Sequence, residues 1–270
     1  MGQDARRPGR EHVSESQDRD PTGRFTGRVD AYERFRPSYP NAVISFLNDE
    51  GLTPEHVIAD VGSGTGLLSR LFLENGNRVY GVEPNLAMRE AAEAALGSYG
   101  GFVSVDGRAE DTGLAAGSVD LVVAGQAFHW FDVGPTKEEF QRVLRPNGWI
   151  ALIWNTRRTK STPFLAAYEA FLRRWCPEYE DVSSHYADPD SLAMLWGPDN
   201  YRRAAFENSQ ELDLGGLEGR LQSSSYAPAP GHVLHEPMVA ALRTLFAEHE
   251  SGGRVRFEYD TEVYLGAVGG

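Results

Sequence analysis

The chain has 270 residues, of which 41% are hydrophobic, so it can form one large domain with a sizeable core. Its formal net charge of -13 argues against nucleic acid and anionic membrane surfaces as partners, because both need clustered Lys and Arg. The single cysteine, Cys176, excludes an internal disulfide and a thiolate metal cluster, and the histidines show no metal-ligand spacing.

The N-terminal region predicts a tail followed by a lid. Residues 1–23 are polar, charged or small, with almost no large apolar side chain, which predicts a disordered tail. Residues 24–50 predict two short helices around a Pro-rich break, flanking the sheet as a helical lid. No apolar run resembles a secretory signal or could span a bilayer. We therefore expect a cytoplasmic monomer or homodimer with no membrane partner.

Residues 51–156 alternate between strand patterns and helix patterns, and form the expected core. The strand patterns lie near 57–61, 78–83, 101–106, 119–125 and 149–154. Helical patterns separate three pairs of them, near 66–74, 85–96 and 133–144. Strands separated by helices predict right-handed βαβ units and a parallel sheet.

The C-terminal part breaks this alternation. Residues 157–205 contain an amphipathic helix pattern and a second helical stretch, which predicts a helical cap inserted before the sheet is complete. Residues 206–270 would complete the sheet within the same domain. The segment 254–265 alternates polar and apolar residues with period two, and a strand near 206–214 would pair with it.

The most informative segment is residues 59–67, which follow an apolar strand and precede an apolar helix pattern. Gly62, Gly64 and Gly66 would bring backbone N–H groups to a helix N-terminus, where a nucleotide-like ligand is favoured. Glu83 ends the next strand at about the 20-residue spacing at which an acid meets a ribose diol. Leu67 departs from the nicotinamide and flavin fingerprint. A tight turn without ligand and an ordinary surface acid are the alternatives.

These motifs resemble those of class I S-adenosylmethionine methyltransferases. Residues 60–66 resemble the first motif of that class and residues 82–85 the second. Further similar segments are the adenine-edge loop, the fourth strand and the turn before the fifth strand, at 109–111, 118–124 and 142–149. Residues 32–40 and 126–131 are similar to the UbiE-like type 11 branch, which acts on small molecules and includes trans-aconitate-type enzymes.

The resemblance implies an α/β, Rossmann-like doubly wound fold, with a mostly parallel seven-stranded sheet and one antiparallel strand. It implies S-adenosylmethionine as the cofactor. Asp60 would accept from the cofactor amino group, directly or through water, unless it only caps the turn. The expected cofactor-binding residues are Tyr32, Arg36, Asp60, Gly62, Ser63, Gly64, Gly66, Glu83, Pro84, Ala109, Glu110 and Gln126.

For two pairs of these residues, the sequence also allows a role without cofactor contact. Ala109 and Glu110 would lie beside the adenine edge, with an ordinary acidic loop as an equal alternative. Tyr32 and Arg36 are four residues apart and so share a helix face. The resemblance implies that Tyr32 packs on the cofactor, with Arg36 near its carboxylate; a surface cation–aromatic pair is the alternative. Tyr39 would line the substrate entrance.

Residues 126–131 follow the fourth strand, where ligands bind in open α/β sheets. We expect His129 to be the catalytic residue, as a general base or alternatively as a hydrogen-bonding wall, with core packing as the simpler interpretation. Trp130 and Phe131 would contact substrate, exclude water and face the sulfonium, whereas Tyr39 would contact substrate at the entrance. The Asn/Asp-Pro-Pro-aromatic element of nucleic-acid and amide N-methyltransferases is absent from this segment.

We therefore expect a methyltransferase that methylates oxygen or carbon of a small molecule and uses no metal. Two alternatives remain open: a methyltransferase-fold enzyme that catalyses another reaction, and a non-catalytic subunit that binds S-adenosylmethionine. Specificity would reside in residues 157–232, which are rich in aromatic side chains.

Overall fold

The computed structural model describes residues 35–180, 188–224 and 226–267. Their central feature is a seven-stranded sheet with the order β3-β2-β1-β4-β5-β7-β6. The strands are β1 (Val57–Val61), β2 (Arg78–Val82), β3 (Phe102–Val105), β4 (Val119–Gly125), β5 (Leu144–Arg157), β6 (Arg202–Leu212) and β7 (Val255–Ala267). The pairs from β3 through β5 are parallel, whereas β7 runs antiparallel to both β5 and β6. The expected fold class is confirmed.

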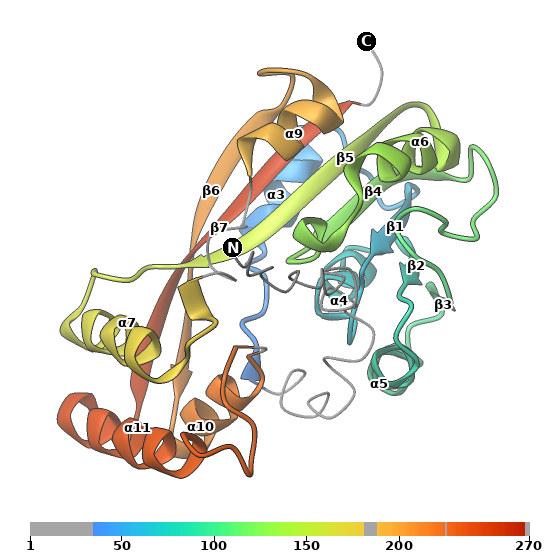
Figure 1. Ribbon diagram of the computed structural model, residues 1–270. Helices are drawn as coiled ribbons and strands as arrows, with labels where there is room; N and C mark the ends of the chain where they lie inside the picture. The colour runs from blue at the N-terminus through green and yellow to red at the C-terminus, as the bar shows by residue number, and fades with distance from the viewer. Residues whose placement is uncertain (1–34, 181–187, 225, 268–270) are drawn as a thin grey trace, which may run out of the picture.

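Helices cover both faces of the sheet (Figure 1). They are α3 (Ala42–Asp49), α4 (Leu67–Glu74), α5 (Leu86–Leu96), the 3-10 turn η1 (Phe128–Trp130), α6 (Val133–Val143), α7 (Pro163–Trp175), α9 (Pro189–Trp196), α10 (Leu214–Gln222) and α11 (His235–His249). None of the helices within the described ranges combines the length and the apolar character needed to cross a bilayer.

Alternating side chains of the buried strands supply two apolar clusters, one on each face. Val123 of β4 packs in the cluster that contains α3 and α4, whereas its neighbour Val122 packs with Phe140 of α6. Helix α9 joins this second cluster through Leu195. Helix α9 therefore packs on the sheet, although it lies in the segment expected to form the cap.

A third apolar cluster lies at the far ends of the long strands β6 and β7 (Figure 1). It joins α7, α10 and α11 through side chains such as Leu172, Leu217 and Leu242, and includes Phe257 of β7. We call these three helices, with the adjoining ends of β6 and β7, the cap. Two of its helices, α10 and α11, fall within residues 206–270, where the sequence analysis predicted only strands.

The structure explains why α10 has a weak sequence signal. Its sequence, LGGLEGRLQ, contains three glycines, which have low helix propensity. Gly219 is required by packing, because a Cβ there would lie 2.2 Å from the ring of Phe35. The predicted tail and the lid residues before Phe35, including Tyr32, lie outside the described residues. The division of the chain into domains stays a prediction.

Candidate functional site

The glycine loop joins β1 to α4 in a backbone conformation that favours glycine. Gly62, Gly64 and Gly66 have φ values of 69°, 56° and 83°, all in the left-handed region. The amides of Gly62 and Ser63 both donate to the carbonyl of Val82, at 2.9 and 3.1 Å. The loop is therefore fixed against the end of β2.

The three glycines have different surroundings. A Cβ on Gly62 would lie 2.6 Å from Cβ of Ala127, and one on Gly66 would lie 2.4 Å from Cδ1 of Leu96. These two glycines thus allow close packing against the turn after β4 and against α5. A Cβ on Gly64 would meet no atom within 4 Å. The space above Gly64 can therefore admit a ligand.

The carboxylate of Glu83 lies beside this loop. Its Oε2 accepts from the Gly64 amide at 3.0 Å, and its Oε1 accepts from the Asn85 amide at 2.9 Å. Arg89 donates to the Glu83 carbonyl at 2.7 Å and to Asp106 at 2.9 Å, which links the ends of β2 and β3. Each carboxylate oxygen keeps a second lone pair for a hydroxyl. Pro84 lies in the turn between these contacts and α5.

Burial raises the pKa of both acids at this edge of the sheet. Desolvation raises the pKa of Glu83, against the lowering effect of its amide donors. Asp60 is completely buried, and desolvation raises its pKa to about 7. Ser69 donates to Oδ2 of Asp60 at 2.6 Å, but Oδ1 has no hydrogen-bond partner among the described residues. An unpaired buried acceptor is costly, so this oxygen fits a ligand that brings a donor such as an ammonium group.

The predicted adenine loop is tied to the start of α6. Ala109 is buried, and Oε1 of Glu110 accepts from the amide of Asp132, the residue before α6, at 2.9 Å. The backbones of Arg108 and Asp111 pair with each other across the loop. The carboxylate of Glu110 therefore positions the loop, and its role at the adenine edge stays a prediction.

The turn after β4, residues 126–131, has a constrained backbone. Gln126 has a φ of 57°, which is unusual for a residue other than glycine. Its amide donates to the carbonyl of Ile153 at 3.0 Å, and its side chain donates to the carbonyl of Asn155 at 3.2 Å. These contacts with β5 hold the turn in place, so we call it the β4-exit turn.

The aromatic residues of the β4-exit turn divide into two groups. Phe128 is buried and packs edge-on against Phe131 and Trp154. His129 and Trp130 are half-buried, with ring centroids 4.9 Å apart. Phe128 is therefore a core residue, whereas His129 and Trp130 remain partly accessible. Phe131 lies close to the glycine loop, since a Cβ on Gly62 would be 3.4 Å from its ring.

Residues 35–39, which we call the strap, connect the cap with the end of β4. The hydroxyl of Tyr39 would lie only 2.5 Å from a Cβ on Gly125, so this tyrosine covers the last residue of β4. At the other end, Arg36 donates to the carbonyl of Ser223, just after α10, at 3.0 Å. The structure thus brings Tyr39 to the predicted site and places Arg36 against the cap. The predicted contact of Arg36 with the cofactor carboxylate stays a prediction.

Asn155, which was not among the residues predicted from the sequence, anchors the strap to the sheet. Its side chain donates to the carbonyls of Pro37 and Ser38 at 3.4 and 3.3 Å, and accepts from Thr261 at 2.5 Å. Asn208 of β6 donates to the same Ser38 carbonyl at 2.7 Å. A sequence signal was present, because Asn155 directly follows the apolar strand pattern 149–154, and Thr261 is a polar residue at an apolar position of the alternating segment 254–265.

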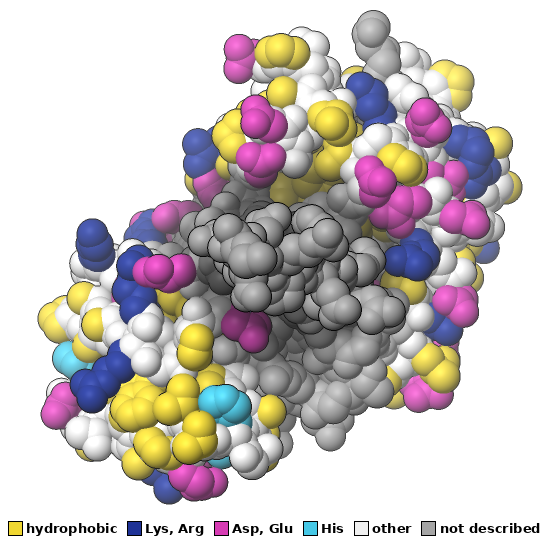
Figure 2. Space-filling model, viewed as in Figure 1, with side chains coloured by type: hydrophobic (Ala, Val, Ile, Leu, Met, Phe, Trp, Pro, Cys, Tyr) yellow, Lys and Arg dark blue, Asp and Glu magenta, His cyan; other side chains and the backbone are white. Residues whose placement is uncertain are grey.

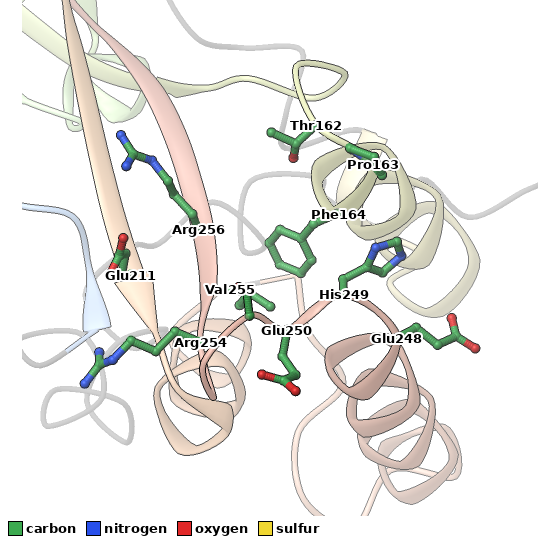
Figure 3. A pocket seen from close by; sticks show the side chains of 11 residues that line it. Thr162, Pro163, Phe164, Glu211, Glu248, His249, Glu250, Arg254, Val255 and Arg256 are labelled. Carbon is green, nitrogen blue, oxygen red and sulfur yellow. The ribbon is translucent and has the colours of Figure 1, made fainter.

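A hollow of about 550 Å³ lies at the outer end of the cap, between the start of α7, the end of α11 and the start of β7 (Figure 3). Its lining mixes apolar groups such as Phe164 with charges of both signs, including Arg254 and Glu250. None of its lining residues belongs to the glycine loop or the β4-exit turn. This hollow is therefore separate from the nucleotide-type site.

Comparisons with known proteins agree with this geometry. Residues 59–152 match the type 11 family model of a methyltransferase domain. An uncharacterized methyltransferase of Mycobacterium tuberculosis is 40% identical over 139 residues, which is 52% of this chain and 55% of that protein. One from Schizosaccharomyces pombe is 34% identical over 155 residues, 56% of this chain and 59% of that protein. The chain thus spans little more than half the length of these relatives.

A solved structure extends the likeness beyond the family segment. A protein from Anaeromyxobacter dehalogenans, assigned as a type II methyltransferase, superposes with a TM-score of 0.64 at 26% identity. The alignment covers 87% of this chain and 98% of that protein. With the family match, it confirms the expected resemblance to class I methyltransferases, and S-adenosylmethionine as the cofactor of that class.

We expect Gly64→Val to abolish binding of S-adenosylmethionine while the protein stays folded. The valine side chain would enter the open space above the loop, and its left-handed backbone would cost about 1–2 kcal/mol. Gly117→Val is the matched control, because Gly117 has a φ of 60° and a Cβ there would likewise meet no atom within 4 Å. Gly117 lies just before the start of β4, away from the glycine loop. Calorimetry that shows equal cofactor affinity for both variants would contradict the assignment.

We expect Glu83→Ala to weaken binding of S-adenosylmethionine by about 1.5–3 kcal/mol, the usual range for hydrogen bonds to a charged group. The exposed acid Glu90 on α5 provides the control, since Glu90→Ala removes a charge nearby without touching the loop. Titration calorimetry measures both affinities, and thermal unfolding reports any loosening of the Gly64 and Asn85 contacts. Wild-type affinity in the Glu83 variant would exclude the ribose role.

The raised pKa of Asp60 predicts opposite effects of pH on stability and binding. The folded protein keeps the Asp60 proton up to about pH 7, whereas an unfolded aspartate loses it near pH 4. This group should therefore lower the free energy of unfolding as pH rises from about 4 to about 7. Over the same range S-adenosylmethionine should bind more tightly, because its ammonium group prefers the ionised carboxylate. Both pH dependences should diminish in Asp60→Asn, and unchanged profiles would refute the contact.

Proposed function

We propose that this chain, which carries a class I S-adenosylmethionine-dependent methyltransferase domain of the type 11 kind, transfers a methyl group to oxygen or carbon of a small molecule. The observation that carries the proposal is the arrangement at the carboxyl ends of β1 and β2. There the unpaired Oδ1 of Asp60, the open space above Gly64 and the carboxylate of Glu83 lie around one loop.

S-adenosylmethionine supplies a methyl group activated on a cationic sulfur. In the proposed complex, the Oδ1 of Asp60 accepts from the amino group of the cofactor, and Glu83 accepts from its ribose hydroxyls. The Gly64 position leaves the approach to the loop free of side-chain atoms. These residues fix the position and orientation of the methyl group, and contribute no covalent chemistry.

The β4-exit turn would position the acceptor. Trp130 and Phe131 exclude water and offer aromatic faces to the sulfonium cation. Tyr39 bounds the entrance from the strap side, over Gly125. Holding the acceptor atom in line with the methyl group and sulfur can contribute roughly 7–11 kcal/mol of barrier reduction. A base is needed only if the acceptor atom carries a proton that is not acidic, and His129 is the residue placed for that step.

Charge supports a small-molecule acceptor over a nucleic acid. The chain has a formal net charge of -13. On the face drawn in Figure 2, described Lys and Arg side chains are interspersed with Asp and Glu, and do not form a continuous basic track. A nucleic acid would need several clustered cations to contact its phosphates.

Formation of S-adenosylhomocysteine tests the proposal directly. The full chain is incubated with S-adenosylmethionine and, in separate reactions, with a deproteinised metabolite extract, total RNA and a protein fraction. We expect product only with the metabolite extract, and none with the Gly64→Val variant. Transfer only to RNA or protein would overturn the small-molecule acceptor. Tight cofactor binding without transfer in any reaction would favour the non-catalytic alternative.

We expect His129→Ala to reduce turnover far more than affinity for S-adenosylmethionine, because His129 lies on the β4-exit turn and not beside Glu83. If His129 is a general base, the loss should be roughly 10²–10⁴-fold. The wild-type rate should then rise through the range in which histidine loses its proton, roughly pH 5 to 8. His232→Ala serves as control, because His232 is an exposed histidine outside the site.

His129→Asn separates the two roles that remain open for this residue. An asparagine can still form a hydrogen bond but cannot accept a proton at neutral pH. A variant that keeps most activity, with a flat pH profile in both enzymes, would identify His129 as a wall residue. The acceptor would then be a group that needs no deprotonation, such as a carboxylate.

A further inference from the structure

Two arginines of the cap side lie among the same tyrosines. Arg157 is the last residue of β5 and lies directly opposite Tyr259 of β7. Arg220 projects from α10 and interacts electrostatically with Tyr259, Tyr226 and Tyr168. Arg157 also interacts with Tyr226 and Tyr168, and its guanidinium lies 5.2 Å from the ring centroid of Tyr168. We call these five residues the arginine–tyrosine cluster.

The carboxylate that lies beside this cluster, Glu169, already has several partners. Arg157, whose side chain is only 12% exposed, pairs with Glu169 at 2.6 Å. The same carboxylate accepts from the exposed Arg173 at 3.1 Å and from the hydroxyl of Tyr179 at 2.7 Å. The Nη1 atom of Arg157 is inaccessible to solvent and has no hydrogen-bond partner in the described part of the chain. Glu169 therefore balances part of the charge of Arg157 and none of the charge of Arg220.

Arg220 has no counter-ion within the part of the chain that the structure describes. Its Nε is inaccessible to solvent and unpaired, its Nη1 makes a long contact of 3.5 Å to the hydroxyl of Ser224, and its guanidinium also interacts with the hydroxyl of Tyr259. The tyrosines around it cannot neutralise it, because phenols are uncharged at neutral pH. Burial raises the pKa of Tyr168 further, which keeps that phenol protonated. A buried cation without a partner is unfavourable unless a ligand supplies the anion.

The cluster borders the proposed acceptor site. Arg157 lies two residues beyond Asn155 on β5, about 6–7 Å along the strand. The carbonyl of Asn155 accepts from Gln126 of the β4-exit turn. Residues two apart in a strand lie on the same face of the sheet. Arg157 therefore lies on the face from which Asn155 contacts the strap. Arg36 of the strap reaches Ser223, three residues after Arg220. A small molecule could therefore contact both the cluster and the β4-exit turn.

We propose that Arg157 and Arg220 bind an oxyanion of the methyl acceptor, a carboxylate or a phosphate, while the reacting atom of that acceptor lies at the β4-exit turn. This inference rests on the proposed function for the identity of the bound molecule. Planar guanidinium groups match both oxyanions through paired N–H donors, and the phenols of Tyr168 and Tyr226 can donate to the remaining oxygens. The anion would supply the charge that the cluster lacks.

The test measures anion binding without requiring turnover. Protein saturated with S-adenosylhomocysteine is titrated calorimetrically with succinate and, separately, with inorganic phosphate, at constant ionic strength set with chloride. We expect one of the two anions to bind wild type at least tenfold more tightly than it binds Arg220→Met. Arg174→Met is the matched control, because Arg174 is an exposed arginine of the same cap, and it should bind like wild type. Preference for succinate or for phosphate distinguishes the two oxyanions.

Thermal unfolding separates a ligand site from a structural one. Removing an unpaired cation should raise the melting temperature of Arg220→Met without anion, and should abolish the further increase that the preferred anion gives wild type. If Arg220 only packs on the tyrosines, the melting temperature should fall, and the anion response of all variants should be equal. Either of those results, or the absence of anion binding by wild type, overturns the proposal.

Two further measurements keep this test independent of the proposed function. Affinity for S-adenosylhomocysteine should be the same in wild type and Arg220→Met. If neither protein binds S-adenosylhomocysteine, the result counts against the cofactor site and not against the cluster. Arg220→Lys keeps the charge but loses the paired donors, and should bind the preferred anion with intermediate affinity. Anion affinity equal to wild type in the lysine variant would show that recognition depends on charge alone and would contradict the paired-donor geometry.

Discussion

The carboxylate of Glu83 accepts hydrogen bonds from the amides of Gly64 and Asn85, and the arrangement of the nucleotide edge depends on this pair of contacts. Glu83 follows β2 directly, so the contacts join the loop after β1 to the turn after β2. The loop is also fixed by the two amides that donate to Val82. Because the glycine loop is held from β2 and not by its own side chains, it can leave open the space above Gly64.

A second constraint, centred on Asn155, relates this edge to the cap. Asn155 binds the strap through its side chain and Gln126 through its carbonyl. The strap therefore lies in a fixed relation to the β4-exit turn, with Tyr39 at one end and Arg36 at the cap. A change in the position of the cap would be transmitted along residues 35–39 to the entrance above Gly125. In this way the cap, although distant in sequence, can influence the end of β4.

The part of the site that could be predicted depends on local sequence. Glycines at positions that need positive φ, and an acid at the end of the next strand, leave a signal within about 20 residues. The arginine–tyrosine cluster leaves no such signal. Arg157 and Arg220 are far apart in the chain and meet only because β5 and α10 converge on the same tyrosines. The glycines that weaken the helical pattern of α10 are also those that let Phe35 approach, so a requirement of packing concealed the helix. Helix α11 was detectable, since Met238, Leu242 and Leu245 recur at helical spacing.

The cofactor side and the cap side each contain a buried group that lacks a partner of opposite character. Among the residues that the structure describes, Asp60 has a buried oxygen without a donor on the cofactor side, and Arg220 has a buried cation without a counter-ion on the cap side. An unsatisfied buried polar group costs about 1–3 kcal/mol, which is a considerable part of the 5–15 kcal/mol that stabilises a typical domain. Such costs are retained where a ligand removes them. If an ammonium group pairs with Asp60 and an oxyanion pairs with Arg220, each ligand stabilises the element that holds its partner residue. Since the strap and Asn155 connect these elements, binding on one side would also favour the arrangement that the other side requires.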